Sequence, residues 1–199
     1  MSKEKHILTD ADGVLVNWNS GFEIFMAERG YPRLPDSDHE YSITKRHKNV
    51  PEEVSRSLVG EFANSEHIAN LEPFADSVKY VKLLAEEGFR FTVITALNDS
   101  PMATMNRMKN LHNLFGNVFN DIQCIQMGAM KTEFLRPWEG TGHFWIEDHP
   151  GQAVAGHQLG LKSVLIDHPH NRNHIDDLFP RVSNHAPWEE IYEMVMKHY

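Results

Sequence analysis

Two aspartates separated by one residue, Asp10 and Asp12, follow a short apolar run over residues 6–9 and precede Gly13. The run predicts a buried strand that ends in a loop. Two carboxylates at this spacing lie on the same side of an extended strand end, where they repel each other unless a cation or a hydrogen-bond donor is near. One can attack as a nucleophile while the other transfers a proton. The pair therefore predicts nucleophilic and acid–base chemistry at the end of the first strand.

A surface turn is the alternative interpretation of these residues, because Asp and Gly are common in turns. A calcium loop of the EF-hand type does not fit, since the segment lacks the further acidic residues and the final Glu of such a loop. The position directly after a buried strand favours the catalytic interpretation.

The strongest predicted strand covers residues 89–95, and residues 95–98 at its carboxyl end offer a second group of candidate functional residues. The hydroxyl of Thr95, free amides such as that of Ala96, and the start of a following helix are suited to bind an anion, with Asn98 in the same loop. An ordinary strand-to-helix loop is the alternative. Taken alone, the segment fits that ordinary loop better, and an anion site is its functional interpretation.

A lysine and an acidic pair complete the candidates. Lys131 offers a cation, although most lysines are solvated surface residues. Glu147 and Asp148 follow another apolar strand and resemble a site for a hard cation, because Mg²⁺ takes a few carboxylates together with water and substrate phosphate. Alternatively, Asp148 caps a helix that starts near Pro150, and one oxygen cannot fully serve both roles.

Alternating strands and helices would bring these segments together. The predicted strands cover residues 6–9, 89–95, 122–125, 144–146 and 163–166, and the predicted helices cover 75–84, 102–111, 150–159 and 188–196. This alternation predicts the α/β class, with a Rossmann-like parallel sheet covered by helices on both faces. Functional sites of such sheets lie at the carboxyl ends of the strands. In the second helix, Met102, Met105, Met108 and Leu111 recur at a helical spacing and predict a core face.

Residues 17–72 fit this alternation poorly, since they contain prolines, a polar stretch over 36–49 and two helical pieces near 22–29 and 52–62. We interpret them as a small helical cap inserted after the first strand, with Phe22 and Phe25 in its core. Residues 1–16 and 73–199 would then form the core domain.

The composition limits the class of partner. The 199 residues are 41% apolar and 24% charged, which suits one domain with a small lid. A net charge of −9, from 19 basic and 28 acidic residues, argues against duplex nucleic acid, although a bound divalent cation would still admit a small anion. Without a run of 18 apolar residues or a secretory signal at the N-terminus, no membrane partner is expected. A single cysteine, Cys124, points to a reducing compartment.

The four chemical segments, in this order, resemble the four sequence motifs of the haloacid dehalogenase-like hydrolase superfamily. Residues 10–18 are similar to the opening of the 5′(3′)-deoxyribonucleotidases, which have an aromatic residue at the position of Trp18 and a compact helical cap at this insertion point. The resemblance covers residues 7–14 and 89–167 and extends less closely into the insertion.

The resemblance implies a role for each matching residue. Asp10 would be the nucleophile that forms an aspartyl-phosphate, and Asp12 would be the general acid for the leaving oxygen and then the base for water. Thr95 and the amide of Ala96 would hold the phosphoryl oxygens. Lys131 would bridge Asp10 and the phosphate.

The resemblance also implies a Mg²⁺ ion bound by Asp10, the main-chain carbonyl of Asp12, and Asp148, with Glu147 behind the ligands or on a metal-bound water. A cation and a lysine would offset the repulsion between an anionic nucleophile and an anionic phosphate. An acid at position 12 favours a phosphoryl substrate, because the dehalogenase branch lacks it. Arg136 is a rival for the cationic role, since the stretch from Lys131 to Asp148 is longer than expected.

Several residues keep two interpretations. The side chain of Trp18 either would stack on a nucleobase or would pack the cap against the core. The basic run 45–48 attracts the anionic substrate or is a solvated face. His168, His170 and His174 have the chemistry of metal ligands but lie in a polar stretch where loops are expected. His149 would contact the substrate or a metal ligand.

We therefore expect a Mg²⁺-dependent phosphomonoesterase of the cytoplasm that acts on a small phosphorylated substrate, a nucleoside monophosphate in the first instance. A phosphatase of sugar or other metabolite phosphates and a non-catalytic binding protein on the same fold are the alternatives. An oligomer is compatible with the sequence.

Overall fold

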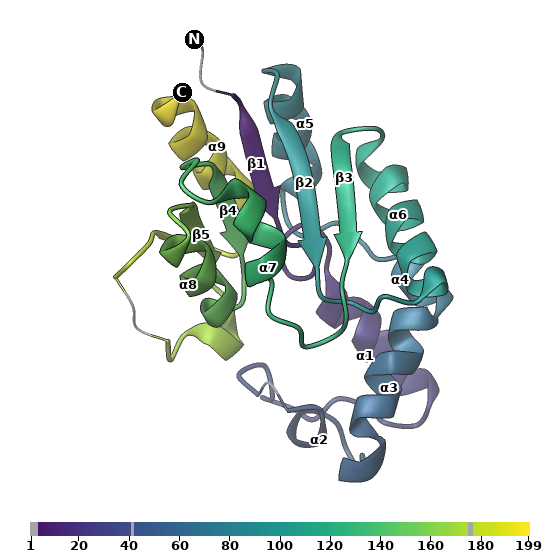
Figure 1. Cartoon of the computed structure of the whole chain (residues 1–199). Helices are drawn as coiled ribbons and strands as arrows, with labels where there is room; N and C mark the ends of the chain where they lie inside the picture. Colours follow the sequence, from purple (N-terminus) through teal and green to yellow (C-terminus); the bar gives the residue numbers. More distant parts are fainter. Residues whose placement is uncertain (1–3, 41, 175–176) are drawn as a thin grey trace.

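The computed structural model describes residues 4–40, 42–174 and 177–199, and within these ranges six parallel strands form one sheet in the order β3-β2-β1-β4-β5-β6 (Figure 1). The strands are β1 (His6–Thr9), β2 (Arg90–Thr95), β3 (Phe119–Cys124), β4 (Phe144–Glu147), β5 (Lys162–Ile166) and β6 (Arg181–Val182). The predicted α/β class and parallel sheet are confirmed. The short edge strand β6 is absent from the prediction, because two residues carry no readable pattern.

Helices cover both faces of the sheet. The helices after the insertion are α5 (Ser77–Glu86), α6 (Pro101–Phe115), α7 (Thr132–Leu135), α8 (Pro150–Gln158) and α9 (Pro187–His198), with 3₁₀ turns at Arg136–Trp138 and Pro169–Asn171. Helices α5, α6 and α9 lie behind the sheet in Figure 1, and α7 and α8 lie in front of it. Successive side chains of a strand point to opposite faces, so Ile7 enters the large cluster under α5, α6 and α9, whereas Leu8 packs with Trp145 on the other face.

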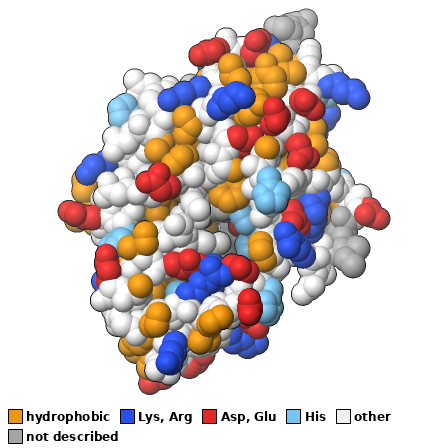
Figure 2. All heavy atoms as spheres, turned by 180° about the vertical axis from the view of Figure 1, so that it is seen from behind, with side chains coloured by type: hydrophobic (Ala, Val, Ile, Leu, Met, Phe, Trp, Pro, Cys, Tyr) orange, Lys and Arg blue, Asp and Glu red, His pale blue; other side chains and the backbone are white. Residues whose placement is uncertain are grey.

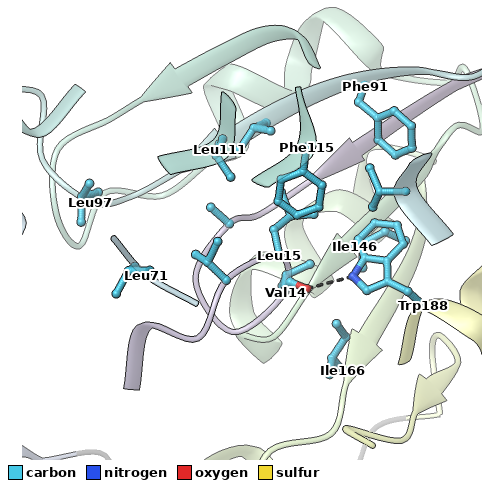
Figure 3. Close-up of a cluster of buried hydrophobic side chains, with 14 of the residues drawn as sticks. Val14, Leu15, Leu71, Phe91, Leu97, Leu111, Phe115, Ile146, Ile166 and Trp188 are labelled. Atoms are coloured by element: carbon cyan, nitrogen blue, oxygen red, sulfur yellow. Dashed lines mark hydrogen bonds between the residues drawn. The ribbon is translucent and has the colours of Figure 1, made fainter. Parts of the chain in front are cut away.

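The large cluster fixes the loop that leaves β1. Trp188 of α9 is fully buried and donates a hydrogen bond from its indole nitrogen to the carbonyl oxygen of Val14, over 2.8 Å (Figure 3). Phe91, Phe115 and Ile146 pack around this pair. A buried carbonyl is costly without a partner, so the C-terminal helix holds the segment that follows the two aspartates.

Within its described residues, 17–40 and 42–72, the insertion forms four helices at the carboxyl end of the sheet (Figure 1). They are α1 (Trp18–Glu28), α2 (Ile43–Arg46), α3 (Glu52–Asn64) and α4 (Glu66–Ala69). Phe22, Phe25 and Phe62 make mutual ring contacts with centroids 5.2–6.0 Å apart and are almost completely buried. The prediction that Phe22 and Phe25 lie in the core of the insertion is confirmed. Residue 41 of the insertion, and residues 1–3 of the N-terminus on which the signal-peptide prediction partly depends, lie outside the described residues.

The prediction that the methionines of α6 form its core face is wrong. Met102, Met105 and Met108 are 50%, 56% and 48% exposed. The buried face of the helix instead consists of Ala103, Asn106, Arg107, Asn110, Leu111 and Phe115. Both buried asparagines donate to the insertion, Asn106 to the carbonyl of Ser65 over 3.0 Å and Asn110 to the carbonyl of Leu71 over 2.8 Å. The hydrogen bonds between α6 and the insertion, and not the spacing of its apolar side chains, therefore determine which face of α6 is buried.

A serine and a proline begin α6. Ser100 is the N-cap residue, its hydroxyl accepts a hydrogen bond from the amide of Ala103 over 3.1 Å, and Pro101 occupies the first turn.

Of the helices in the described ranges, none is both long enough and apolar enough to cross a membrane.

Candidate active site

The two aspartates of the first motif lie where β1 ends, at the floor of a cavity of about 440 Å³. Asp10 is 7% exposed, and its amide continues the sheet pairing with a hydrogen bond to the carbonyl of Ile146 over 2.9 Å. Gly13 then turns the chain with φ +72°, and a Cβ atom at this residue would lie 2.5 Å from Oδ2 of Asp148. Glycine is therefore required here both for the turn and for the close approach of Asp148.

Lys131 connects the first aspartate to the second acidic motif. Its Nζ lies 2.8 Å from Oδ1 of Asp10 and 2.7 Å from Oε1 of Glu147. Burial by itself lowers the pKa of this lysine, but the two carboxylates outweigh burial and raise the pKa above its ordinary value. Lys131 is therefore held as a cation between two acids.

Glu147 is fully buried and uses both of its carboxylate oxygens. Oε1 accepts from Lys131, and Oε2 accepts from the amides of Asp148 and His149 over 2.7 and 3.2 Å. Burial is the largest cause that raises the pKa of Glu147, followed by the charge of Asp10. The N-cap residue of α8 is His149 and not Asp148, so the alternative interpretation of Asp148 as a helix cap is wrong. Glu147 accepts the hydrogen bonds of the main-chain amides just before α8, so the carboxylate of Asp148 does not cap the helix.

Asp10, Glu147 and Asp148 form a group that suits a hard cation. One oxygen from each residue lies within 4.8 Å of the others, and within the described residues no other group of three potential ligands meets this condition. Burial, followed by the charges of Glu147 and Asp10, raises the pKa of Asp148 well above its ordinary value. Three carboxylates facing one cation from Lys131 leave an excess of negative charge, which a divalent ion would neutralise.

The segment after β2 is brought to the same place only in part. Thr95 is fully buried, and its hydroxyl oxygen has no hydrogen-bond partner among the described residues. Ala96 lines the cavity together with Leu97. Asn98, by contrast, is not among the residues that line the cavity, and its side-chain oxygen accepts a hydrogen bond from the amide of Ser100 over 3.0 Å. The structure thus uses Asn98 to shape the turn that precedes α6.

Arg107 is a residue that the sequence reasoning missed. It projects from the middle of α6, is fully buried, and donates a hydrogen bond from Nη2 to Oδ1 of Asp12. Burial raises the pKa of the Asp12 carboxyl, and the nearby guanidinium opposes that shift. A signal was present in the sequence, since Ala103, Arg107, Leu111 and Phe115 recur every fourth residue and so share one helix face.

Arg136, the rival of Lys131, lies outside the carboxylate group. It is exposed and pairs with Glu133 over 2.8 Å and with Glu139 over 3.9 Å. The rival assignment of the cationic role is therefore wrong.

The insertion supplies the opposite wall of the cavity. Its lining residues are Trp18, Asn19, Phe22, Glu40, Ile43, Arg46 and Val59. Trp18 stacks on Phe22 with ring centroids 4.6 Å apart and is half-buried, so it packs within the insertion and also faces the cavity. Within the basic run, Arg46 alone lines the cavity, and it donates to Asn19 over 3.0 Å and to Glu23 over 2.8 Å.

The histidines after β5 support the site without forming a three-ligand group of their own among the described residues. His168 Nε2 lies 2.8 Å from the carbonyl oxygen of Gly13, and His170 Nε2 lies 3.7 Å from Oδ2 of Asp148. Asn171 donates to the carbonyl of Asp148 over 2.7 Å. The loop after β5 therefore fixes the backbone around the carboxylates.

His149, which lies between β4 and α8, lines the cavity, and burial lowers its pKa.

We compared the sequence with those of known families and proteins. A family model described as "5′ nucleotidase, deoxy (Pyrimidine), cytosolic type C protein" matches residues 4–199. The chain is 30% identical over 134 residues to an uncharacterized 32.4 kDa protein in the Gp30-rIII intergenic region of Enterobacteria phage T4. The match covers 65% of this chain and 48% of that protein, so the chain spans about half the length of this relative.

Solved structures share the fold at low sequence identity. A haloacid dehalogenase-like hydrolase from Streptococcus pneumoniae has a TM-score of 0.66 and 16% identity, over 98% of this chain and 100% of that chain. CbbY from Rhodobacter sphaeroides in complex with phosphate has a TM-score of 0.59 and 16% identity, over 89% of this chain and 92% of that chain. The HAD-hydrolase YfnB from Bacillus subtilis, bound to magnesium, has a TM-score of 0.63 and 11% identity, over 98% and 99%.

Proposed function

The chain belongs to the 5′ nucleotidase, deoxy (pyrimidine), cytosolic type C family, a group of phosphoric monoester hydrolases on the haloacid dehalogenase-like fold, and from this premise we propose that it hydrolyses nucleoside monophosphates through an aspartyl-phosphate. One observation carries the proposal. Asp10 and Asp12, Lys131, and Asp148 come from three separate segments of the chain and line a single cavity at the carboxyl ends of the strands. Such convergence is what a phosphoryl-transfer site needs, because catalysis depends on positioning and on the neutralisation of charge.

In the proposed reaction, a carboxylate oxygen of Asp10 attacks the phosphorus atom and the ester bond to the leaving oxygen breaks. Asp12 gives its proton to that oxygen as the alcohol leaves. Asp12 then takes a proton from a water molecule that attacks the aspartyl-phosphate, which releases inorganic phosphate and restores Asp10. Lys131 holds Asp10 in place and offsets the negative charge that accumulates, since its Nζ lies 2.8 Å from the attacking group.

The carboxylate group fits a magnesium ion. We propose Asp10, Asp148 and the main-chain carbonyl of Asp12 as the ligands, with Glu147 outside them, because both oxygens of Glu147 already accept hydrogen bonds. The ion would supply positive charge that reduces the repulsion between the Asp10 carboxylate and the phosphate. A solved structure of the same fold is bound to magnesium, which agrees with this assignment.

Thr95 and Ala96 are the proposed phosphate-binding residues. The hydroxyl of Thr95 is buried without a partner among the described residues, so a phosphoryl oxygen would satisfy it. We do not retain the predicted substrate contact of Asn98, since its side chain holds the turn before α6.

Residues 17–72 are proposed to act as the cap that selects the substrate, with residues 1–16 and 73–199 as the core domain. The apolar wall formed by Trp18, Phe22, Ile43 and Val59 suits a flat nucleobase. A phosphatase of sugar phosphates remains the second candidate, because the charged side chains of Glu40 and Arg46 line the same wall and could bind hydroxyl groups.

We propose no duplex nucleic acid as a partner, because the net charge of −9 disfavours binding to a phosphate backbone. On the face shown in Figure 2, Lys and Arg side chains lie among Asp and Glu side chains and form no broad basic area. The small phosphorylated substrate is the partner that we propose, and the cytoplasm is the proposed compartment, which fractionation of the host cell would test.

A substrate panel tests the function. The purified protein with Mg²⁺ is compared on nucleoside 5′- and 3′-monophosphates, deoxynucleotides and sugar phosphates, with kcat/KM as the measure of preference. We expect the highest kcat/KM for a nucleoside monophosphate and no detectable turnover by Asp10→Asn. A higher kcat/KM for a sugar phosphate would favour the second candidate, and turnover retained by Asp10→Asn would contradict the mechanism.

A further inference from the structure

The middle of α6 contains a buried guanidinium next to the proposed general acid. Arg107 has no exposed surface, and its Nη2 donates to Oδ1 of Asp12. Its Nε and Nη1 atoms have no hydrogen-bond partner among the described residues. Burying a charge is costly unless it is paired, and this arginine makes only part of the hydrogen bonds it could make. Such a residue is a poor choice for stability alone.

The attachment of α6 to its surroundings does not need this arginine. Asn106 donates to the carbonyl of Ser65 over 3.0 Å, and Asn110 donates to the carbonyl of Leu71 over 2.8 Å. Ser100 at the helix start also bonds to Asn64. These three side chains already connect the helix to the insertion, whereas Arg107 reaches the loop after β1.

We propose that Arg107 is a positioning residue for Asp12, an inference that rests on the proposed function. Arg107 does not line the cavity, whereas Asp12 does, so the arginine acts on the substrate only through the carboxyl group that it holds. By fixing Oδ1, the guanidinium stops the carboxyl from rotating and keeps the group facing the leaving oxygen. Proton transfer requires a hydrogen-bond distance and a defined direction, and small displacements reduce it strongly.

The proton that Asp12 supplies gives the proposal a specific readout. When the P–O ester bond breaks, the oxygen of an alkyl ester such as a nucleotide departs as a strong base and needs the proton. The oxygen of p-nitrophenyl phosphate departs as a weak base and needs no proton. The value of kcat/KM covers only the steps up to the departure of the leaving group, so it excludes the later role of Asp12 as a base. A displaced Asp12 therefore impairs the nucleotide more than the aryl ester.

The test compares kcat/KM for both substrates in the full-length protein with Mg²⁺. Arg107→Met retains the apolar stem without the guanidinium, and Arg107→Lys restores a single donor with a charge. We expect Arg107→Met to lower kcat/KM for the nucleotide by at least about 100-fold and for p-nitrophenyl phosphate by less than about 10-fold. Arg107→Lys should recover part of the nucleotide rate. The ratio of the two values does not depend on the folded fraction, so partial unfolding of a variant does not affect it.

Asn110→Ala is the matched control, since it removes a buried side chain of the same helix that contacts a main-chain carbonyl away from the site. It should change the kcat/KM for both substrates by the same factor. An unchanged ratio in both Arg107 variants would overturn the inference. If the wild type hydrolyses both esters and the ratio stays constant, only this inference fails. If the wild type hydrolyses neither ester, the proposed function itself fails.

Discussion

The ammonium nitrogen of Lys131 lies 2.7 Å from Oε1 of Glu147, and both side chains are almost wholly excluded from solvent. The same nitrogen lies 2.8 Å from Asp10, so one cation balances two buried carboxylates. Separating a buried ion pair by removing one partner is far more costly than replacing both, because the remaining charge has lost its compensation. The stability of the site therefore depends on Lys131 as much as its chemistry does.

Lys131→Met is expected to lower the free energy of unfolding by about 3–5 kcal/mol and to abolish turnover. Adding Glu147→Gln should recover part of the lost stability, because it removes one of the two uncompensated carboxylates, while activity stays absent. Urea unfolding of the single and double variants measures both effects. Lys82→Met changes an exposed lysine of α5 and should leave stability within about 0.5 kcal/mol of the wild type. Equal stability of Lys131→Met and Lys82→Met would contradict the structure.

The first and fourth motifs could be predicted from the sequence because their geometry is local. A strand followed at once by polar residues places those residues at the edge of a parallel sheet, whatever the rest of the chain does. Asp10, Glu147 and Asp148 therefore lie together as the strand assignments imply. The division of labour between Glu147 and Asp148 was less accessible, because it depends on which carboxylate the amides before α8 reach.

Helix α6 shows why the remainder could not be predicted. Its methionines recur at a helical spacing, yet they face solvent, while Asn106, Arg107 and Asn110 are buried. Polar side chains are buried where a partner from another element satisfies them, and that partner is not visible in the helix itself. For Arg107 the partner is Asp12, 95 residues away in the chain.

Removal of divalent metal is expected to stop turnover, and Mg²⁺ is expected to stabilise the resting protein. The carboxylates of Asp10, Glu147 and Asp148 crowd within 4.8 Å of one another, so a bound cation lowers the free energy of the folded state only. Thermal unfolding should show a Tm that rises with Mg²⁺ after dialysis against EDTA. Asp148→Asn should lose most of this rise, whereas Asp121→Asn, at an exposed carboxylate of β3, should keep it. A Tm that does not respond to Mg²⁺ in the wild type would contradict a magnesium site here.

Substitution of Trp18 separates its two interpretations. If the ring stacks on a nucleobase, Trp18→Leu should raise KM for a nucleoside monophosphate by about 10-fold, because a base–aromatic stack contributes ~1–3 kcal/mol. The KM for glycerol phosphate, which has no base, should not change. Phe62→Leu is the control, since Phe62 is fully buried against Trp18 and shapes the insertion without lining the cavity. A proportional change of both KM values in Trp18→Leu would assign the residue to packing alone.

His6 is expected to make stability depend on pH in mildly acidic solution. The ring is 4% exposed and lies 3.0 Å from the hydroxyl of Thr92, and burial, with His143 nearby, lowers its pKa to about 4. The folded protein therefore binds a proton at this ring less readily than the unfolded chain, whose histidine titrates near 6.5. The contribution of neutral His6 is complete above pH 6.5 and is lost as the pH falls toward 4, by at most about 3 kcal/mol.

Urea unfolding at several pH values between 4 and 7 measures this dependence against His6→Gln, which has no titrating ring. The stability of the wild type relative to His6→Gln should fall as the pH is lowered through this window. His112→Gln, at an exposed residue of α6, controls for the loss of one imidazole from the unfolded chain. Because several other buried or half-buried histidines also have lowered pKa values, the wild type alone would show a similar trend, and only the difference between wild type and His6→Gln reports on His6. A difference that stays constant from pH 4 to 7 would show that the folded protein protonates His6 as readily as the unfolded chain.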